Sequence, residues 1–310
     1  MKLTLFTLLV LSTICFVSCR KSGGDIDIKQ YDQQQIQNYI AVNGITGMQR
    51  DLTNGDTTGI YYKITIPGDP TKPVDYPDSI SYVYTIHSFD GKFVAADTVL
   101  NHYEGFLGHV VPNGLMLSIR NLLKYKGGKM RVLIPSHLAY GEKGIHTGSN
   151  TVANNNIAGN QCLDYTINLI SDQALYDDLV IRNYMTANNL TGFTKLATGP
   201  AAGMYYKIKT AGTGTSININ SSITTNFLLQ TMNNSVDTTY KTTTATFTDL
   251  LALTPGSRTG LEMVKGGSDI VLLIPSRLTY GTSGQSTTLL TIPANACLKY
   301  EYYNITVTNY

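Results

Sequence analysis

The chain contains the same segment of eight residues twice, 140 positions apart. Ile134–Gly141 reads Ile-Pro-Ser-His-Leu-Ala-Tyr-Gly and Ile274–Gly281 reads Ile-Pro-Ser-Arg-Leu-Thr-Tyr-Gly, so six of the eight residues are identical. A pair of glycines precedes each copy, at positions 127–128 and 266–267. A chain of 310 residues is long enough for two domains that each bury a core. The repetition therefore predicts two domains of one fold, whose chemistry is either present twice or lost once.

The similarity between the two copies begins well upstream of this segment. Ile36–Gly47 matches Ile181–Gly192, and each has the pattern of a short amphipathic helix that ends at Asn or Gly. The next matched segments, Gly59–Ile64 and Gly203–Ile208, are rich in Tyr and β-branched residues and predict first strands. The offset between the copies falls from 145 to 140 along the chain, so the loops differ in length while the elements persist.

The spacing of apolar residues before the first glycine pair predicts a second short helix. Leu115, Ile119 and Leu122 recur at i, i+4 and i+7, which places them on one helix face. We expect each domain to be α+β, with an antiparallel sheet wrapped around this short helix and with another short helix in front. The two domains are expected to cover residues 30–172 and 173–310.

The amino terminus has the pattern of an export signal over residues 1–18, because Lys2 is followed by an apolar run too short to span a bilayer. The run ends in Phe-Val-Ser-Cys, which resembles a bacterial lipobox and predicts a lipid on Cys19. Residues 19–29 would then be a lipidated tether that needs no transmembrane helix. The alternative is an ordinary signal peptide with an incidental cysteine. The expected location is the cell envelope, with Cys19 anchored in the outer membrane and the protein facing the periplasm.

Charge, cysteine and histidine patterns argue against several classes of partner. A net charge of +2 with 14% charged residues gives no basic surface for nucleic acid. Cys162 and Cys297 occupy equivalent positions, so we expect small buried side chains in separate cores. The histidines lack metal-ligand spacing, and His137 aligns with Arg277, which argues against a shared metal site. We expect neither a metal nor a cofactor.

The residues from Gly127 to Gly141 resemble a known family. Their pattern, Gly-Gly-Lys-x-Arg-x-x-Ile-Pro-x-x-Leu-Ala-Tyr-Gly, is similar to the core signature of FKBP-type peptidyl-prolyl isomerases. The second copy keeps much of it and adds Ile292–Ala296, which is similar to the family's segment before the last strand. The resemblance covers nearly all of the chain after the signal. It implies two FKBP-like domains in a bacterial lipoprotein that isomerises prolyl bonds in exported polypeptides.

Prolyl isomerisation needs little of the apparatus that other enzymes carry. Amide resonance imposes a rotation barrier of about 18–20 kcal/mol, although cis and trans forms before proline differ by only about 0.5–1 kcal/mol. A catalyst holds the proline ring in an apolar pocket, removes water from the amide and donates hydrogen bonds to the twisted form. The absence of a Ser-His-Asp, Cys-His or metal pattern is therefore compatible with this activity.

The resemblance also implies the site residues. Tyr140 and Tyr280 match the tyrosine whose hydroxyl donates to a bound carbonyl, and Tyr84 and Asp97 complete the catalytic set expected in the first domain. Taken alone, these are ordinary core or turn residues, and only the surrounding motif gives them these roles. The side chains expected to line the substrate pockets are Phe106, Val111, Leu115, Ile157 and Tyr165 in the first domain, and Phe227, Asp237, Phe247, Tyr280, Ile292 and Tyr300 in the second.

The chain departs from the family at the floor of the pocket, where the family usually has Trp. There is no Trp in this sequence. Leu115 is expected at the floor in the first domain and Ser257 in the second. Leu keeps the floor apolar, whereas Ser leaves a small polar floor that binds a proline ring weakly. We therefore expect activity mainly in the first domain and a degenerate second domain.

Two other functions stay open at this stage. The missing Trp favours a non-catalytic FKBP-like module that binds peptides or acts as a chaperone, and a purely structural surface lipoprotein is the third possibility. For the isomerase, the expected partners are proline-containing polypeptides. No nucleic-acid partner is expected, and contact with the membrane is expected through the lipid only. The sequence leaves the oligomeric state open.

Overall fold

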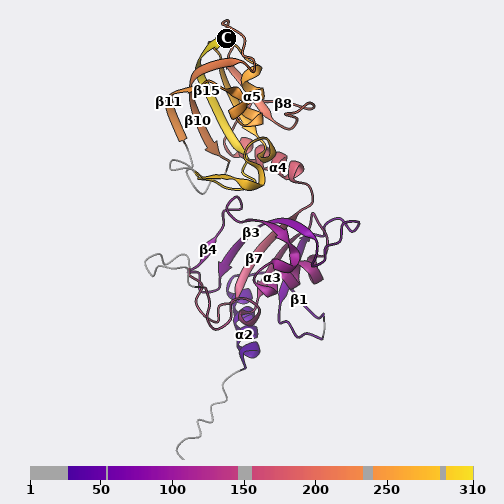
Figure 1. The fold of residues 1–310 in the computed structure, drawn as a ribbon. Helices are drawn as coiled ribbons and strands as arrows, with labels where there is room; N and C mark the ends of the chain where they lie inside the picture. The colour runs from indigo at the N-terminus through magenta and orange to yellow at the C-terminus, as the bar shows by residue number, and fades with distance from the viewer. Residues whose placement is uncertain (1–26, 54, 146–155, 233–239, 287–290, 310) are drawn as a thin grey trace, which may run out of the picture.

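The computed structural model describes residues 27–53, 55–145, 156–232, 240–286 and 291–309. The expected export signal, most of the tether with Cys19, and Asp237 lie outside the described residues. Within them, no helix is long and apolar enough to cross a bilayer. The chain folds into two halves, one after the other, each with its own antiparallel sheet and short helices (Figure 1). The expected α+β class, with antiparallel sheets and few helices, is confirmed.

The first half runs from α2 to β7 and pairs its strands in the order β1-β2-β6-β7-β3-β4, with β5 also on β3. Every pairing is antiparallel. Its elements are α2 (Ile28–Val42), β1 (Gln49–Arg50), β2 (Tyr61–Ile66), β3 (Ser79–Ser88), β4 (Val94–Ala95), β5 (His102–Phe106), η1 (Leu107–His109), α3 (Asn113–Ser118), η2 (Ile119–Leu123), β6 (Lys129–Ile134), η3 (Ser136–Leu138) and β7 (Leu163–Ile170).

The second half repeats this topology, because its order β11-β10-β15-β12-β9-β8 matches the first when β10 is equated with β3 and β15 with β7. Its elements are α4 (Gln173–Ala187), β8 (Thr194–Lys195), β9 (Tyr205–Thr210), β10 (Ser221–Thr231), β11 (Tyr240–Phe247), η5 (Leu250–Ala252), α5 (Pro255–Glu262), β12 (Asp269–Ile274), η6 (Ser276–Leu278), η7 (Gly281–Ser283), β13 (Gln285–Ser286), β14 (Thr291–Ile292) and β15 (Leu298–Asn309).

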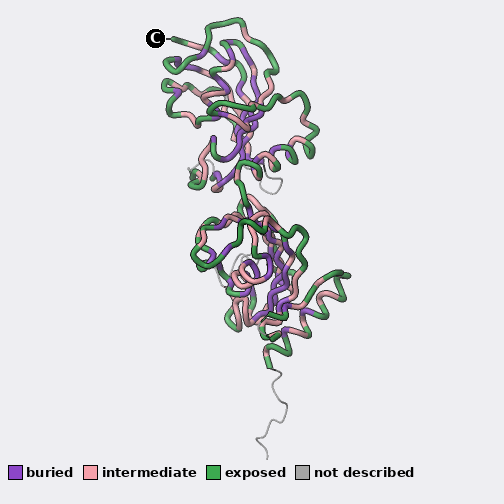
Figure 2. Tube along the Cα trace, turned by 90° about the vertical axis from the view of Figure 1, so that its right-hand side faces the viewer, coloured by how far each residue is buried: buried purple, intermediate pink, exposed green. Residues whose placement is uncertain are grey.

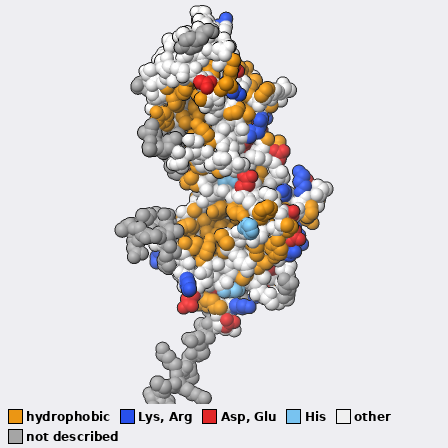
Figure 3. Space-filling model, in the orientation of Figure 1, with side chains coloured by type: hydrophobic (Ala, Val, Ile, Leu, Met, Phe, Trp, Pro, Cys, Tyr) orange, Lys and Arg blue, Asp and Glu red, His pale blue; other side chains and the backbone are white. Residues whose placement is uncertain are grey.

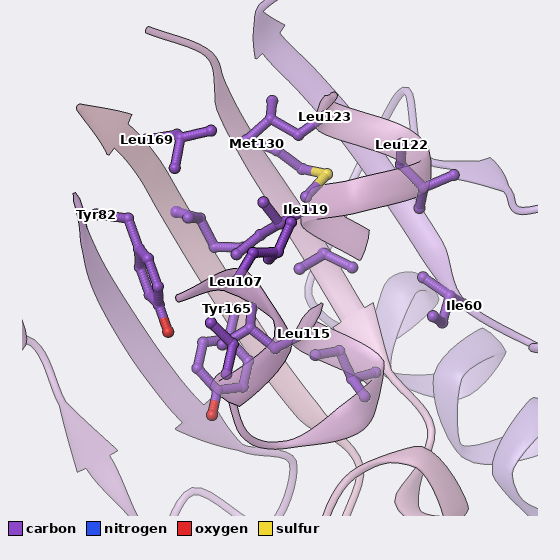
Figure 4. Packing of buried hydrophobic residues seen from close by; sticks show 14 of the residues in the cluster. Ile60, Tyr82, Leu107, Leu115, Ile119, Leu122, Leu123, Met130, Tyr165 and Leu169 are labelled. Atoms are coloured by element: carbon purple, nitrogen blue, oxygen red, sulfur yellow. The ribbon is translucent and has the colours of Figure 1, made fainter. Parts of the chain in front are cut away.

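The short helix of the first half is the centre of its core. The α-helix ends at Ser118, and the chain continues as one π-helical turn that carries Ile119 and Leu122. Together with Leu115 they form the expected apolar face, and all three are buried against the sheet (Figure 4). Buried segments run through the sheets of both halves, while the connecting loops are mostly exposed (Figure 2).

A buried aspartate ties each leading helix to the Ile-Pro-Ser segment of its own half. Asp32 on α2 accepts hydrogen bonds from Ser136 Oγ at 2.7 Å and from the backbone N–H of His137 at 3.1 Å. Asp177 on α4 accepts from both the backbone N–H and the Oγ of Ser276, at 2.8 and 2.7 Å. The relative exposures of the aspartates are 1% and 0%. Each carboxylate therefore fixes the segment that leads to the motif tyrosine.

The two cysteines occupy equivalent buried positions in separate clusters of the two halves. Cys162 and Cys297 are both free thiols, 2% and 3% exposed. Each packs beneath its leading helix, close to the buried aspartate of that half. Burial raises the pKa of both thiols. They therefore act as small apolar side chains, as the sequence predicted.

Candidate functional site

A tight turn after each Ile-Pro-Ser segment presents the motif tyrosine. In the first half, the backbone N–H of Gly141 donates to the carbonyl of Ser136 at 2.9 Å. Gly141 has φ of 61° and Gly281 has φ of 54°, a left-handed backbone that favours glycine. The conserved Tyr-Gly order within the repeat thus has a conformational reason: the glycine reverses the chain directly after Tyr140 and Tyr280.

Three of the predicted first-half tyrosines come together at one side of the core. Tyr84 and Tyr140 are half-buried and pack against the cluster that contains Tyr165. The rings of Tyr84 and Tyr165 lie 5.8 Å apart between centroids. Burial raises the pKa of all three hydroxyls, so at neutral pH they are uncharged and able to donate hydrogen bonds.

The predicted floor and lip of the first half belong to the same cluster. Leu115 is 1% exposed and lies beside Tyr165 (Figure 4), and Ile157 is 2% exposed. Tyr82, which sequence reasoning missed, is also buried there and lies near Tyr84 and Tyr103. Residues 146–155, which connect the motif to Ile157, are outside the described part of the chain.

Phe106 does not form the aromatic wall expected of it. The register between β3 and β5 pairs Phe106 with Ser79 at the end of the strand, where its side chain is 52% exposed. Its ring packs edge-on against His109. Tyr103 packs against the core instead, with its ring stacked 5.0 Å from that of Tyr82. The motif assigned an aromatic residue to β5, and only the register decides which one turns inward.

Val111 stands exposed just before the short helix, with 72% of its surface accessible. The structure therefore places it outside the buried cluster of Tyr84, Tyr140 and Tyr165. Its counterpart in the second half, Leu253, is half-buried and packs against the core.

Asp97 lies in a loop at the junction of the two halves. Its carboxylate accepts a hydrogen bond from the backbone N–H of Val99 at 2.8 Å, so it shapes its own loop. This loop and α4 line a cavity of about 460 Å³ between the halves. Val99 packs against the core of the second half, and Asn295 Nδ2 donates to Glu104 Oε2 at 3.2 Å. The loop of Asp97 thus contributes to the contact between the halves, and the catalytic role of Asp97 stays a prediction.

The second half contains a cavity of about 310 Å³ at the equivalent of the tyrosine cluster. It is lined by all of the predicted second-half site residues that the structure describes, namely Phe227, Phe247, Tyr280, Ile292 and Tyr300, together with Leu229, Tyr240, Ala252, Leu253, Thr254, Ser257, Gln285 and Tyr302. None of these lining residues is charged. Figure 3 shows hydrophobic side chains gathered on one face of the molecule in both halves.

Aromatic rings form the walls of this cavity. The centroid of Phe227 lies 5.8 Å from that of Phe247 and 5.7 Å from that of Tyr240. Tyr300 and Tyr302 are stacked 5.6 Å apart at the opposite side of Phe227. Tyr302 has no aromatic counterpart in the first half, because β7 carries Ile167 at the equivalent position. Sequence reasoning missed Tyr302 for that reason.

Ser257 is the floor residue of the second half, as expected from the position of the preceding glycine. A Cβ at Gly114 would overlap Ile134 of β6, and a Cβ at Gly256 would overlap Ile274 of β12, so the two short helices begin against equivalent strands. Leu115 and Ser257 follow these glycines and are equally buried, at 1% exposure each. The smaller serine leaves space where leucine fills the floor. This half thus has a cavity of about 310 Å³, while the weak binding expected of its serine floor stays a prediction.

Burial dominates the electrostatics of the cavity floor. It raises the pKa of Tyr300 and of Tyr302, while the nearby Ser257 hydroxyl acts in the opposite direction on both. The Ser257 Oγ is itself buried, next to the hydroxyls of Tyr300 and Tyr302. The floor is thus a group of neutral hydroxyls that can both donate and accept hydrogen bonds. Among the described residues, no cluster of three His, Cys, Asp or Glu side chains is arranged to hold a metal ion.

Comparisons with known proteins give structural neighbours only. No protein-family model matches the sequence, and no curated protein matches it. The solved structure of FkpA from Escherichia coli is similar with 22% identity and a TM-score of 0.36, over 44% of this chain and 61% of that one. This chain therefore matches less than two thirds of the length of FkpA.

Two further neighbours cover nearly all of their own chains. The three FKBP domains of wheat FKBP73 match over 85% of this chain and 99% of theirs, with 17% identity and a TM-score of 0.32. A peptidyl-prolyl cis-trans isomerase from Pseudomonas syringae matches over 45% of this chain and 98% of its own, with 21% identity and a TM-score of 0.35. Two of these neighbours are thus named as FKBP domains and as a peptidyl-prolyl isomerase, and this chain in its own structure has two antiparallel sheets around short helices.

Proposed function

We propose that this chain is a peptidyl-prolyl cis-trans isomerase that acts on proline-containing polypeptides, with the cavity of the second half as a working site. The observation that carries the proposal is the uncharged aromatic cavity of about 310 Å³ with Tyr280 in its lining. Such a cavity removes water from a prolyl amide without placing a charge near it. The tyrosine cluster around Tyr140 is a second candidate site of the same kind.

The expected chemistry is non-covalent. Phe227 and Phe247 supply apolar walls for a ring, and Tyr280 stands at the position from which the family resemblance has a hydroxyl donating to a bound carbonyl. A donor that bonds more strongly to the twisted amide than to the planar one lowers the rotation barrier. Asp97 has no part in this proposal because its carboxylate is engaged in the loop between the halves.

The experiment is proline-limited refolding of a reporter protein in the presence of the full-length chain and of three variants. Tyr280→Phe and Tyr140→Phe each remove one hydroxyl and keep the ring. Tyr303→Phe is the matched control, because Tyr303 is an exposed tyrosine of the same strand as Tyr300. A hydrogen bond of ordinary strength corresponds to a loss of about tenfold in rate. Acceleration that falls with Tyr280→Phe but not with Tyr303→Phe supports the proposal.

A non-catalytic peptide-binding module is the second candidate function. The polar floor at Ser257 favours it, since a proline ring gains less from a hydroxyl floor than from an apolar one. Refolding that no version of the chain accelerates, together with peptide binding that Tyr280→Phe weakens, would establish the module in place of the isomerase.

We propose in addition that Cys19 carries a lipid that holds the protein in the cell envelope, in the outer membrane and facing the periplasm. The support is the lipobox-like segment that ends at Cys19 after an apolar run. Labelling of cells with a radioactive fatty acid tests this: label should enter the wild-type chain and be absent from Cys19→Ser. Equal labelling of both would remove the anchor from the proposal.

A further inference from the structure

One position at the mouth of the second-half cavity differs in kind from its equivalent in the first half. In the second half, Gln285 pairs with Ile292, and both line the cavity together with Tyr280. In the first half, Ile145 pairs with Ile157, and the backbone N–H of each donates to the carbonyl of the other, at 2.8 and 3.0 Å. We call positions 145 and 285 the rim positions. The second half thus has an amide side chain where the first half has an isoleucine.

The same backbone places both rim positions. Gly144 and Gly284 come directly before them, with φ of 65° and 62°. A Cβ at Gly144 would overlap the carbonyl oxygen of Ile157, and a Cβ at Gly284 would overlap that of Ile292. Glycine is therefore needed at this point of both halves, and it brings the next residue against an equivalent partner. The two rim positions differ in their side chains and not in their backbone.

Gln285 can be reached by a ligand. It is exposed, whereas Ile145 is half-buried and packs against the core of the first half. A glutamine amide has two N–H donors and one carbonyl acceptor. A polypeptide whose proline ring lies among the aromatic walls leaves the cavity past its exposed lining residues. The side chains beside the proline are therefore the part of a client that comes within reach of this amide.

The surroundings of Gln285 restrict the kind of side chain that suits it. None of the described residues that line the cavity is charged, so an ionic side chain would lose water without gaining a counter-charge. An apolar side chain would displace water from the amide without replacing its hydrogen bonds. A neutral side chain with its own donor or acceptor avoids both costs. Isoleucine at the rim of the first half offers no hydrogen bond and favours apolar contact instead.

We propose that Gln285 determines which prolines the second half selects, namely those preceded or followed by a neutral hydrogen-bonding side chain such as asparagine. The first half, with Ile145 at its rim, lacks this preference. The inference rests on the proposed function, because it assumes that the second-half cavity holds the proline of a client. It adds a specificity-determining residue to that function and assigns the two halves to different sequences around proline.

The test uses two pairs of peptides in which asparagine is compared with leucine, because these side chains have the same branching and differ in polarity. One pair is Ala-Asn-Pro-Ala-Ala amide and Ala-Leu-Pro-Ala-Ala amide, and the other has Asn or Leu directly after the proline. Binding to the full-length chain is followed by NMR of isotope-labelled isoleucine methyl groups. The signal of Ile292 reports on the second half and that of Ile157 on the first, so each half is measured separately in one chain.

The variants exchange the rim positions. Gln285→Ile gives the second half the side chain of the first, and Ile145→Gln does the reverse. Ser283→Ala is the matched control, because Ser283 is exposed, lies two residues before Gln285 and does not line the cavity. The methyl signals of Ile119 and Ile270, one in each core, show whether a variant keeps its fold.

The expected result is a change in the affinity of the Asn peptide relative to the Leu peptide. At Ile292, this ratio should be about fivefold higher in the wild type than in Gln285→Ile for one of the two pairs, because one hydrogen bond of ordinary strength is gained. That pair shows on which side of the proline the rim lies. Ser283→Ala should keep the wild-type ratio. Ile145→Gln should raise the ratio at Ile157 and leave it unchanged at Ile292.

Three results would count against the inference, and they differ in what they mean for the proposed function. An equal ratio at Ile292 in the wild type and Gln285→Ile would overturn the inference and leave the isomerase site intact. An equal loss of the ratio in Ser283→Ala would also overturn it, because the effect would then not belong to the rim position. No shift of the Ile292 signal with any peptide, together with refolding that Tyr280→Phe does not slow, would reject the second-half site itself.

Discussion

The two halves share one fold and one tyrosine turn but differ in what lies beneath the tyrosine. In the first half, Leu115 and Ile167 make the floor apolar and closely packed. In the second half, Ser257 and Tyr302 occupy these positions and leave a cavity with hydroxyls at its base. A repeated fold therefore keeps the backbone that presents the tyrosine, while two substitutions on buried elements change the side chains beneath it from apolar to hydroxyl-bearing.

The buried aspartates give a second contrast between the halves. The pKa of Asp32 is lowered because hydrogen bonds from His137 and Ser136 together outweigh the desolvation that opposes them. The pKa of Asp177 is raised because desolvation outweighs its hydrogen bonds from Ser276 and Gln173. His137 Nδ1 lies 2.8 Å from Asp32, whereas Arg277 in the same position of the second half turns to the carbonyl of Ala202. The pKa values of two equivalent carboxylates are thus shifted in opposite directions, and the histidine beside Asp32 is one difference between their surroundings.

The largest expected effect comes from giving the first half the floor of the second. Leu115→Ser should lower the free energy of unfolding of the first half by about 4 kcal/mol, since it removes a fully buried side chain and buries a hydroxyl in an apolar core. Urea unfolding, with hydrogen exchange of β6 and β7 to assign the transition to the first half, measures this. A loss below about 1 kcal/mol would mean that Leu115 is not packed as described.

The next largest loss of stability is expected when the hydrogen bonds between each leading helix and its Ile-Pro-Ser segment are removed. Asp32→Ala and Asp177→Ala should each cost about 2–3 kcal/mol, because each leaves the Oγ of a buried serine, Ser136 or Ser276, without its acceptor. The same unfolding experiment, followed in each half separately, checks this. Arg182→Ala, at an exposed position of α4, is the control and should cost less than about 1 kcal/mol. Equal losses for Asp177→Ala and Arg182→Ala would contradict the anchoring role.

The reverse floor exchange should affect binding more than stability. Ser257→Leu fills part of the cavity, so we expect a change in the free energy of unfolding of less than about 1.5 kcal/mol. It should also weaken the binding of a proline-containing peptide to the second half, because leucine takes up space in the cavity. Calorimetric titration with such a peptide and urea unfolding of the same variant measure both. Unchanged peptide binding with leucine at position 257 would contradict the placement of Ser257 at the floor of the cavity.

The smallest effect is the opposite dependence of the two halves on pH. Asp32 has a folded pKa below its ordinary value of 3.8, so its contribution to stability is present above that pH and is lost as pH falls through the folded pKa. Asp177 has a raised folded pKa, so its contribution is present below 3.8 and is lost as pH rises through the folded pKa. Between about pH 3 and 6, the cost of Asp32→Asn should therefore grow with pH and that of Asp177→Asn should shrink.

Hydrogen exchange of each half, corrected for the pH dependence of intrinsic exchange, measures these two trends in the full-length chain. Parallel trends in both halves would show that His137 does not set the difference between the aspartates. The variant His137→Arg then gives a direct check, because it makes the first half identical to the second at this position. With arginine there, we expect Asp32 to lose part of its pKa depression.

Much of the architecture could be predicted from the repeat itself. Two copies of Ile-Pro-Ser and of the glycine pair predicted two similar antiparallel sheets, and the spacing of Leu115, Ile119 and Leu122 predicted the buried helix face. The tyrosine cluster followed from the family resemblance, since a motif fixes local backbone and the order of elements along the chain.

The features that could not be predicted from the sequence depend on strand register and on how side chains of different volume pack together. Phe106 and Tyr103 are both aromatic residues of β5, and only the pairing with β3 decides that Tyr103 packs inward. The burial of Asp32 and Asp177 is not visible in the sequence, because nothing near them in the chain indicates that Ser136 and Ser276 will lie against them. The cavity of the second half depends on a small side chain surrounded by large ones, which is a property of the packed structure and not of any motif.

The short connection between the halves has a consequence for long clients. Only Ser171 and Asp172 separate the end of β7 from the start of α4, and Asp172 is itself engaged as the cap of that helix. A polypeptide bound at one half, as proposed, would therefore meet the other half at a high local concentration, of millimolar order for short connections. Two weak binding sites, one with an apolar floor and one with hydroxyl groups at its floor, would then bind a single unfolded polypeptide with avidity.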